Sequence, residues 1–159
     1  SAVFSPDGER ALTASNDDSA KIWSAASGEC LQTLTGHADV VKSAVFSPDG
    51  ERALTASNDS SAKIWSAASG ECLQTLTGHV DMVRSAVFSP DGERALTASD
   101  DSSAKIWSAA SGECLQTLTG HRAGLRSAAF SPDGERALTA SDDSSAKIWS
   151  AASGECLQT

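Results

Sequence analysis

Hydrophobic residues in this chain fall in short alternating runs that end at turn-forming residues. In residues 43–76 the runs are SAVFS (43–47), RALTAS (52–57), SAKIWS (61–66) and ECLQTL (71–76), separated by PDG, NDSS and AASG. Turns rich in Gly, Pro, Asn, Asp or Ser at about every eight to twelve residues leave no window for a helical period of 3.6, whereas alternation with β-branched and aromatic residues favours strands. The pattern predicts four strands of about six residues, joined by tight turns into one antiparallel sheet.

The same pattern recurs every 42 residues along the chain. Four tryptophans are equally spaced, at Trp23, Trp65, Trp107 and Trp149. The repeats that start at Ser1 and Ser43 differ only at Asp18/Ser60, Ala38/Val80, Val40/Met82 and Lys42/Arg84. The chain is therefore a tandem array. Such near-identity indicates recent duplication or deliberate design.

Composition and charge narrow the partners that we expect. Hydrophobic residues make up 40% of the chain and aromatic residues 5%, with no Tyr, so the core must be mainly Val, Ile, Leu and Ala. A net charge of -9 argues against nucleic acid, which is bound by neutralising phosphates with Lys and Arg. We expect no membrane span, because no stretch approaches 18 consecutive apolar residues. One cysteine per repeat, never in a CxxC pair, is interpreted as a small apolar strand residue and favours an intracellular compartment.

Several motifs occur at fixed offsets in each repeat: TGH at 35–37, FSPDG at 46–50, LTAS at 54–57, and Asp59 six residues before Trp65. With these motifs the chain resembles the WD-repeat β-propeller family. The resemblance implies an all-β fold with four four-stranded antiparallel blades, at about residues 1–36, 37–78, 79–120 and 121–159. It also implies a non-catalytic protein-interaction module. The name-giving Trp-Asp dipeptide reads Trp-Ser here, at Ser24, Ser66, Ser108 and Ser150.

In the family a His, a Thr or Ser, an Asp and the Trp form a hydrogen-bonded chain within each blade. Carried over, the complete sets are His37, Thr55, Asp59 and Trp65; His79, Thr97, Asp101 and Trp107; and His121, Thr139, Asp143 and Trp149. The first repeat offers Thr13, Asp17 and Trp23 without a His.

These residue types also describe a Ser-His-Asp hydrolase. Near-identical copies and the lack of a GxSxG elbow favour a structural role instead, so we expect no enzyme activity. With one His per blade we expect no metal site, and nothing points to a cofactor.

Variation between repeats is concentrated in two loops, one after the TGH motif and one between the second and third strands. The resemblance places both loops on one face of the propeller, around the channel mouth. We call this the loop face. Loops on a rigid scaffold carry recognition, so the candidate partner-binding residues are Asn16, Asn58, Asp100, Asp142, Val40, Lys42, Met82, Arg84 and Arg126. Alternating charges would suit a peptide or protein segment of mixed charge. The alternative is that variation at these positions is merely harmless. Val41, Val83 and Leu125 stay apolar and are assigned to packing.

The resemblance implies wedge-shaped blades, of which four are too few to close a ring. We therefore expect two chains to form one eight-bladed ring, as a symmetric homodimer with the two-fold axis along the channel. The alternatives are a fragment of a larger propeller, a structural or engineered scaffold with no natural ligand and, least favoured, an enzyme.

Overall fold

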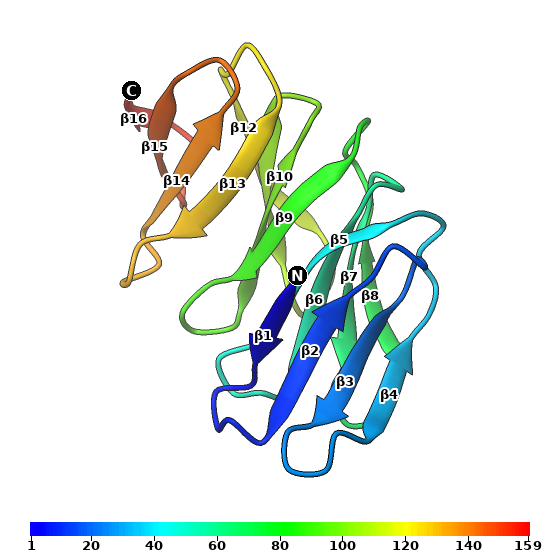
Figure 1. The fold of residues 1–159 in the computed structure, drawn as a ribbon. Coiled ribbons are helices and arrows are strands. Elements are labelled where there is room, and N and C mark those ends of the chain that lie inside the picture. The colour runs from blue at the N-terminus through cyan, green and yellow to red at the C-terminus, as the bar shows by residue number, and fades with distance from the viewer.

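The computed structural model of residues 1–159 is built entirely of strands, in four four-stranded sheets (Figure 1). The first sheet contains β1 (Ala2–Phe4), β2 (Arg10–Ala14), β3 (Ala20–Ser24) and β4 (Cys30–Leu34). The second contains β5 (Val41–Phe46), β6 (Arg52–Ser57), β7 (Ala62–Ser66) and β8 (Cys72–Leu76). The third contains β9 (Val83–Phe88), β10 (Arg94–Ser99), β11 (Ser103–Ser108) and β12 (Cys114–Thr119). The fourth contains β13 (Leu125–Phe130), β14 (Arg136–Ser141), β15 (Ala146–Ser150) and β16 (Cys156–Gln158).

Within each sheet the strands pair antiparallel and lie in chain order. The prediction of an all-β chain with four four-stranded antiparallel blades is confirmed. No helix in the structure is long and apolar enough to cross a membrane.

The first strand of a blade begins earlier than the hydrophobic pattern predicts. In the second blade β5 starts at Val41, and the register with β6 shifts between Val41 and Ser43. Such a shift is typical of a β-bulge, in which an extra residue sits in one strand and re-aims a side chain. Lys42 is accordingly exposed, although Val41 beside it is buried.

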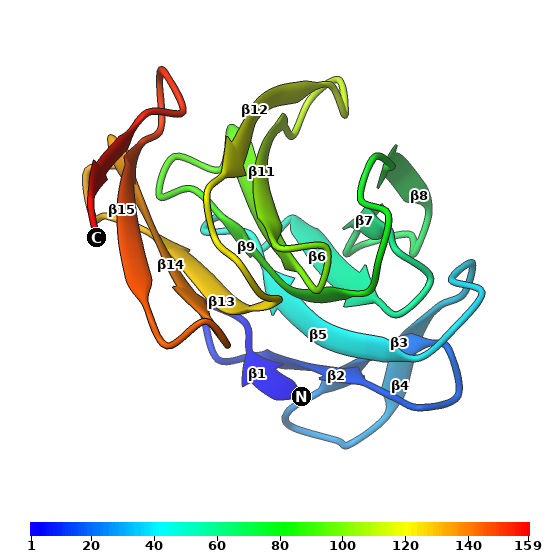
Figure 2. The ribbon, with the colours of Figure 1, turned by 90° about the horizontal axis from the view of Figure 1, so that it is seen from above.

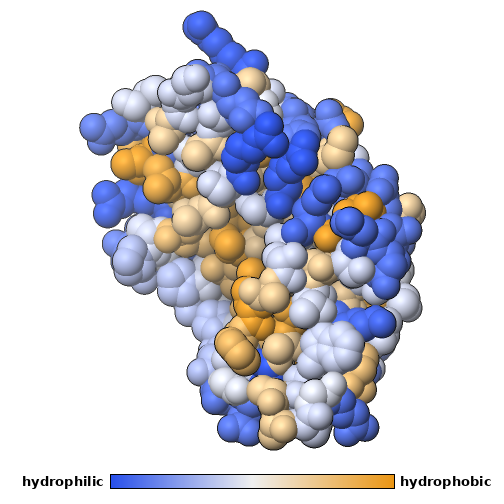
Figure 3. Space-filling model, in the orientation of Figure 1, coloured by the Kyte–Doolittle hydropathy of each residue, from blue (hydrophilic) through white to orange (hydrophobic).

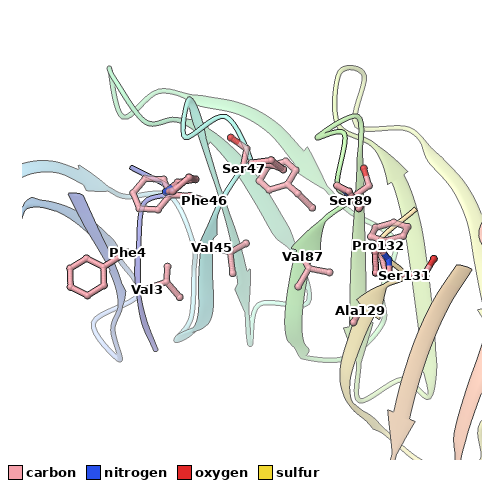
Figure 4. A pocket seen from close by; sticks show the side chains of 15 residues that line it. Val3, Phe4, Val45, Phe46, Ser47, Val87, Ser89, Ala129, Ser131 and Pro132 are labelled. Carbon is pink, nitrogen blue, oxygen red and sulfur yellow. The ribbon is translucent and has the colours of Figure 1, made fainter. Parts of the chain in front are cut away.

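Each blade packs face to face on the next blade along the chain. Seen from above, β1, β5, β9 and β13 lie innermost and the fourth strands lie outside (Figure 2). The four inner strands line an apolar hollow of about 540 Å³ through their Val-Phe-Ser-Pro segments, with Ala129 in place of the last Val (Figure 4). In the space-filling view hydrophobic residues gather near β1 and β9 (Figure 3).

The core lies between blades. At each of the three junctions a cluster joins two faces of neighbouring blades. The forward face, which meets the next blade, supplies Leu54, Ala62 and Ile64 in the second blade. The rear face, which meets the preceding blade, supplies Ala95 and Trp107 in the third. A single blade therefore cannot bury its own apolar surface, as is usual for repeat proteins.

The two outermost faces of the row have no neighbour. On the forward face of the fourth blade Leu138 is 48% exposed, whereas its equivalents Leu12, Leu54 and Leu96 are all 0% exposed. On the rear face of the first blade Phe4 is 71% exposed. Hydrophobic residues are visible over β14 and β15 in Figure 3. Within one chain the blades thus form an open row with two uncovered apolar faces.

The cysteines lie on strands, as expected, but they are not packed as apolar residues. Cys30, Cys72, Cys114 and Cys156 are all free and exposed. Each begins the fourth strand of its blade, which is the outermost strand and has no further neighbour to cover it. These thiols therefore lie at the outer edge of the blades and form no disulfide.

Candidate interaction surfaces

A continuous chain of hydrogen bonds connects the polar residues inside the second blade. The Trp65 indole Nε1 donates to Thr55 Oγ1 at 2.9 Å, and this oxygen lies 2.7 Å from His37 Nε2. His37 Nδ1 lies 2.8 Å from Asp59 Oδ2. With the threonine hydroxyl donating to Nε2, the proton on Nδ1 is donated to the carboxylate, so every member has a partner.

The third and fourth blades carry the same arrangement at distances that differ by about 0.1 Å. The corresponding residues are His79, Thr97, Asp101 and Trp107, and His121, Thr139, Asp143 and Trp149. In the first blade Trp23 Nε1 donates to Thr13 Oγ1 at 2.9 Å, while Asp17 accepts from Ser19. Thr13 and Trp23 are half-buried there, although their equivalents in the other blades are fully buried.

A serine that was not among the predicted residues completes each of these hydrogen-bonded chains. Ser61 Oγ donates to Asp59 Oδ1 at 2.6 Å, and its backbone amide donates to the same oxygen at 2.9 Å. The amide of Ala38 donates to the other carboxylate oxygen at 3.0 Å. The signal was present as a serine two residues after the aspartate, a spacing typical of Asx turns. The carboxylate therefore ties the loop after His37 to the loop between β6 and β7.

The geometry gives a nucleophile no access to a substrate. The Thr55 hydroxyl is 0% exposed and already accepts from Trp65, and His37 is buried beside it. An attacking hydroxyl must reach a carbonyl carbon in a site open to substrate. What this cluster can do is hold two loops and two strands in one arrangement.

Burial and hydrogen bonding shift the pKa values in this cluster downward. Burial lowers the pKa of His37 and of His79 below 6.5, and it outweighs the opposing effect of the paired aspartate. For Asp59 burial raises the pKa, but hydrogen bonds from Ser61, Ala38 and His37 outweigh it and bring the pKa to about 2. The folded cluster thus favours a neutral histidine beside an ionised aspartate.

We expect the free energy of unfolding to fall in two steps as the pH is lowered. Below about pH 6.5 the unfolded chain takes up protons that His37 and His79 resist in the folded state. Between about pH 4 and 2 the unfolded chain protonates Asp59, whose folded pKa is about 2, and further stability is lost. Urea midpoints at pH 7.5, 5.5 and 3 measure both steps. Equal midpoints at pH 7.5 and 5.5 would contradict the first step.

The loop face contains the candidate partner-binding residues, and the structure pairs several of them with each other. Arg84 Nε donates to both carboxylate oxygens of Asp100, each at 2.9 Å. Arg126 Nε donates to Asp142 Oδ1 at 2.7 Å. In the second blade Lys42 has no ion pair, and the residue at the aspartate position is Asn58. Variation in the two loops is therefore coupled, because aspartate occurs where arginine can pair with it.

The remaining candidates differ in how far they are available to a partner. Asn16 is exposed, whereas Val40 and Met82 are half-buried. The carbonyls of these two residues accept backbone hydrogen bonds from Asn58 and Asp100, both at 2.9 Å. Val80, which was not among the predicted partner-binding residues, is 88% exposed in the loop after His79. An apolar residue inside the variable window was the signal for it.

The faces between blades carry polar contacts as well as apolar ones. At the junction of the second and third blades, Arg52 donates through Nη2 to the carbonyl of Gly92 at 2.7 Å, and its guanidinium lies 5.1 Å from the centre of the Phe88 ring. Gln74 donates to the carbonyl of Ala110 at 2.7 Å. We call this set of contacts the clasp.

The clasp recurs at the other two junctions. Between the first and second blades, Arg10 contacts Gly50 and Phe46, and Gln32 donates to Ala68. Between the third and fourth blades, Arg94 contacts Gly134 and Phe130, and Gln116 donates to Ala152. In every case the forward face donates and the rear face accepts. The contact faces between blades are therefore directional.

Comparison with known proteins agrees with this architecture. The family model described as "WD domain, G-beta repeat" matches the chain four times, at residues 1–24, 28–66, 70–108 and 112–150. A human relative, WD repeat-containing protein 86, is 50% identical over 38 residues, which are 24% of this chain and 10% of that protein. The match thus spans about one repeat and a tenth of the relative's length.

Proposed function

Because this chain belongs to the WD40 repeat family, we propose that it is a non-catalytic interaction scaffold whose end blades pair with those of a second copy. WD40 repeats indicate a protein-interaction scaffold, and such domains typically bind proteins or peptides. In the proposed assembly two chains form a homodimeric ring of eight blades, with the inner strands around a central channel. The proposed primary partner of this scaffold is therefore a second copy of the same chain.

The observation that carries this proposal is the uncovered forward face of the fourth blade. Leu138, Ala146 and Ile148 form this face, and the same residue types are buried at each of the three internal junctions. Open apolar faces of this kind mark interaction sites more often than free surface. The face is already shaped to receive a blade.

The rear face of the first blade is the matching surface. It presents Ala11, Trp23 and Ala25, which are identical to Ala53, Trp65 and Ala67 in the second blade. The rear face of the first blade in a second copy thus presents the same residue types to the fourth blade as the rear face of the fourth blade presents to the third. Contacts between a forward face and a rear face close into a ring when the rotation between blades allows it. We call each such contact between two chains a seam. A dimer has two seams, and formation of one raises the effective concentration for the other.

Protein or peptide partners are proposed to bind at the loop face. Lys42 and Asn16 are exposed there without an ion pair, and Val80 adds an apolar contact. Arg84 and Arg126 would have to exchange their aspartate partners for those of a ligand. This favours partner binding centred on the second blade and on the loop of Val80.

The molar mass of the purified chain tests the assembly. Static light scattering after size exclusion is expected to give about 33 kDa, twice the 16.3 kDa of one chain. The mass should hold over a wide range of concentrations, since two seams must break together. A mass of 16.3 kDa at every concentration would overturn the proposed dimer.

A further inference from the structure

Each end of the blade row carries half of a fourth clasp. Arg136 and Gln158 on the fourth blade occupy the positions of the donors Arg94 and Gln116, and neither side chain has the corresponding hydrogen bond within the chain. Arg136 is exposed, whereas its three equivalents are half-buried. At the other end Gly8 is exposed, although Gly50, Gly92 and Gly134 are buried.

From these unmatched halves we infer, building on the proposed dimer, that the seam between two copies is fastened by a fourth clasp. Arg136 of one copy donates to the carbonyl of Gly8 of the second copy and lies over the ring of its Phe4. Gln158 donates to the carbonyl of Ala26 of the second copy. Arg136 and Phe4 are thereby the residues that select the partner blade.

The accepting carbonyls are already held in the conformation that the clasp requires. Gly8 has φ 74°, as Gly50 has, and each glycine amide donates to the carbonyl of the serine three residues earlier at 2.9 Å. The turn that contains Ala26 is closed by Gly28 in the same way as the turn of Ala68 is closed by Gly70, with both bonds at 2.8 Å. A preformed acceptor reduces the entropy lost on binding. The rear face of the first blade is therefore ready to accept a donor.

The donors explain why the seam joins unlike faces. Two forward faces brought together would place Arg136 against Arg136, with no carbonyl to accept from either. Two rear faces would place carbonyls and Phe4 rings together without a donor. Like charges and unpaired polar groups at a contact disfavour the wrong partner. The clasp thus specifies pairing of a forward face with a rear face, which is the arrangement that closes a ring.

A side-chain substitution at the seam separates this inference from simple apolar contact. Arg136→Met keeps an unbranched chain of similar length but removes the donor and the charge. We expect the dimer Kd to rise about 100-fold, because a hydrogen bond from a charged group is worth roughly tenfold at each of two seams. Arg94→Met removes the same group from an internal junction and is the matched control. It should lower the urea midpoint and leave the dimer Kd within about threefold.

A double-mutant cycle tests the contact between Arg136 and Phe4. Phe4→Leu removes the aromatic ring but keeps an apolar side chain, so it should weaken the dimer less once Arg136 is already Met. Sedimentation equilibrium over a dilution series measures all the dissociation constants. Circular dichroism checks that Arg136→Met remains folded, as expected for a side chain that makes no clasp within its own chain.

The possible results distinguish the clasp from the dimer itself. A wild-type dimer whose Kd is unchanged by Arg136→Met would overturn the clasp and leave the proposed function standing. Additive effects of Arg136→Met and Phe4→Leu would overturn the stacking of the guanidinium on the ring. A monomeric wild-type chain at all concentrations would overturn both the clasp and the dimer.

Discussion

Replacing Leu138 with glutamate is expected to give a folded chain that remains a monomer of 16.3 kDa. Leu138 is 48% exposed in the single chain, so the change costs the monomer little. In a closed junction its equivalents are 0% exposed, so the variant would have to bury an unpaired carboxylate. That burial costs several kcal/mol at each seam, which is enough to dissociate a dimer that is held by two such seams.

Leu115→Glu is the matched control for this prediction. Leu115 is 45% exposed, but it lies on β12 at the outer edge of an internal blade, away from the uncovered faces. This variant should keep the mass of the wild-type protein. Light scattering of both variants at equal concentration measures and compares their molar masses. A Leu138→Glu chain that still dimerises would show that the forward face of the fourth blade is not the seam.

Mixing two disabled chains provides a positive test of the same seam. Ala11→Glu blocks the rear face of the first blade, because its equivalents Ala53 and Ala95 are 0% exposed in closed junctions. Leu138→Glu blocks the forward face of the fourth blade. Each variant alone should be monomeric, yet a mixture retains one intact forward face and one intact rear face. An open heterodimer of about 33 kDa is therefore expected, with weaker affinity than the wild-type ring because it has one seam.

The second large effect is expected inside a blade, on changing Thr97 to Val. The Thr97 hydroxyl is 0% exposed, accepts from Trp107 and lies 2.7 Å from His79 Nε2. Its removal leaves a buried indole N–H and a buried imidazole nitrogen without partners, at about 1–3 kcal/mol for each group. We expect a total loss of about 2–6 kcal/mol in the free energy of unfolding, measured by urea denaturation.

Thr13→Val in the first blade makes the same chemical change in a different setting. Thr13 has no histidine to contact, and Trp23 is half-buried, so water can satisfy its N–H. The expected loss is about 1 kcal/mol, since only one hydrogen bond is exchanged for one with water. Equal losses for the two substitutions would show that the histidine chain adds nothing beyond the bond between tryptophan and threonine.

Much of the blade could be predicted from local sequence. The strand boundaries of β6, β7 and β8 agree with the runs 52–57, 61–66 and 71–76 to within one residue. Turn residues such as Pro48 and Gly50 act on their own stretch of backbone, so their effect is visible without knowledge of the fold. The period of 42 residues likewise required only comparison of the chain with itself.

Other features depend on which strands lie next to each other. The bulge at Lys42 reflects the register of β5 on β6, and exposure of Cys72 reflects the outer place of β8. Arg84 and Asp100 are 16 residues apart, and only the sheet brings their charges together. Both residues were predicted as separate partner contacts, because a pattern along the chain gives no distance between strands.

The sequence by itself determined the repeat, the strands within each blade and the polar residues of the buried chain, because these depend on turn chemistry, alternation and near neighbours. Only the tertiary structure decided that Arg52 reaches Gly92, which lies 40 residues away, and that Leu138 stays exposed while Leu96 is buried. The repeats are nearly identical, so their sequence cannot distinguish a covered face from an open one. That difference comes from position in the row, since a blade buries its apolar face only where another blade stands against it.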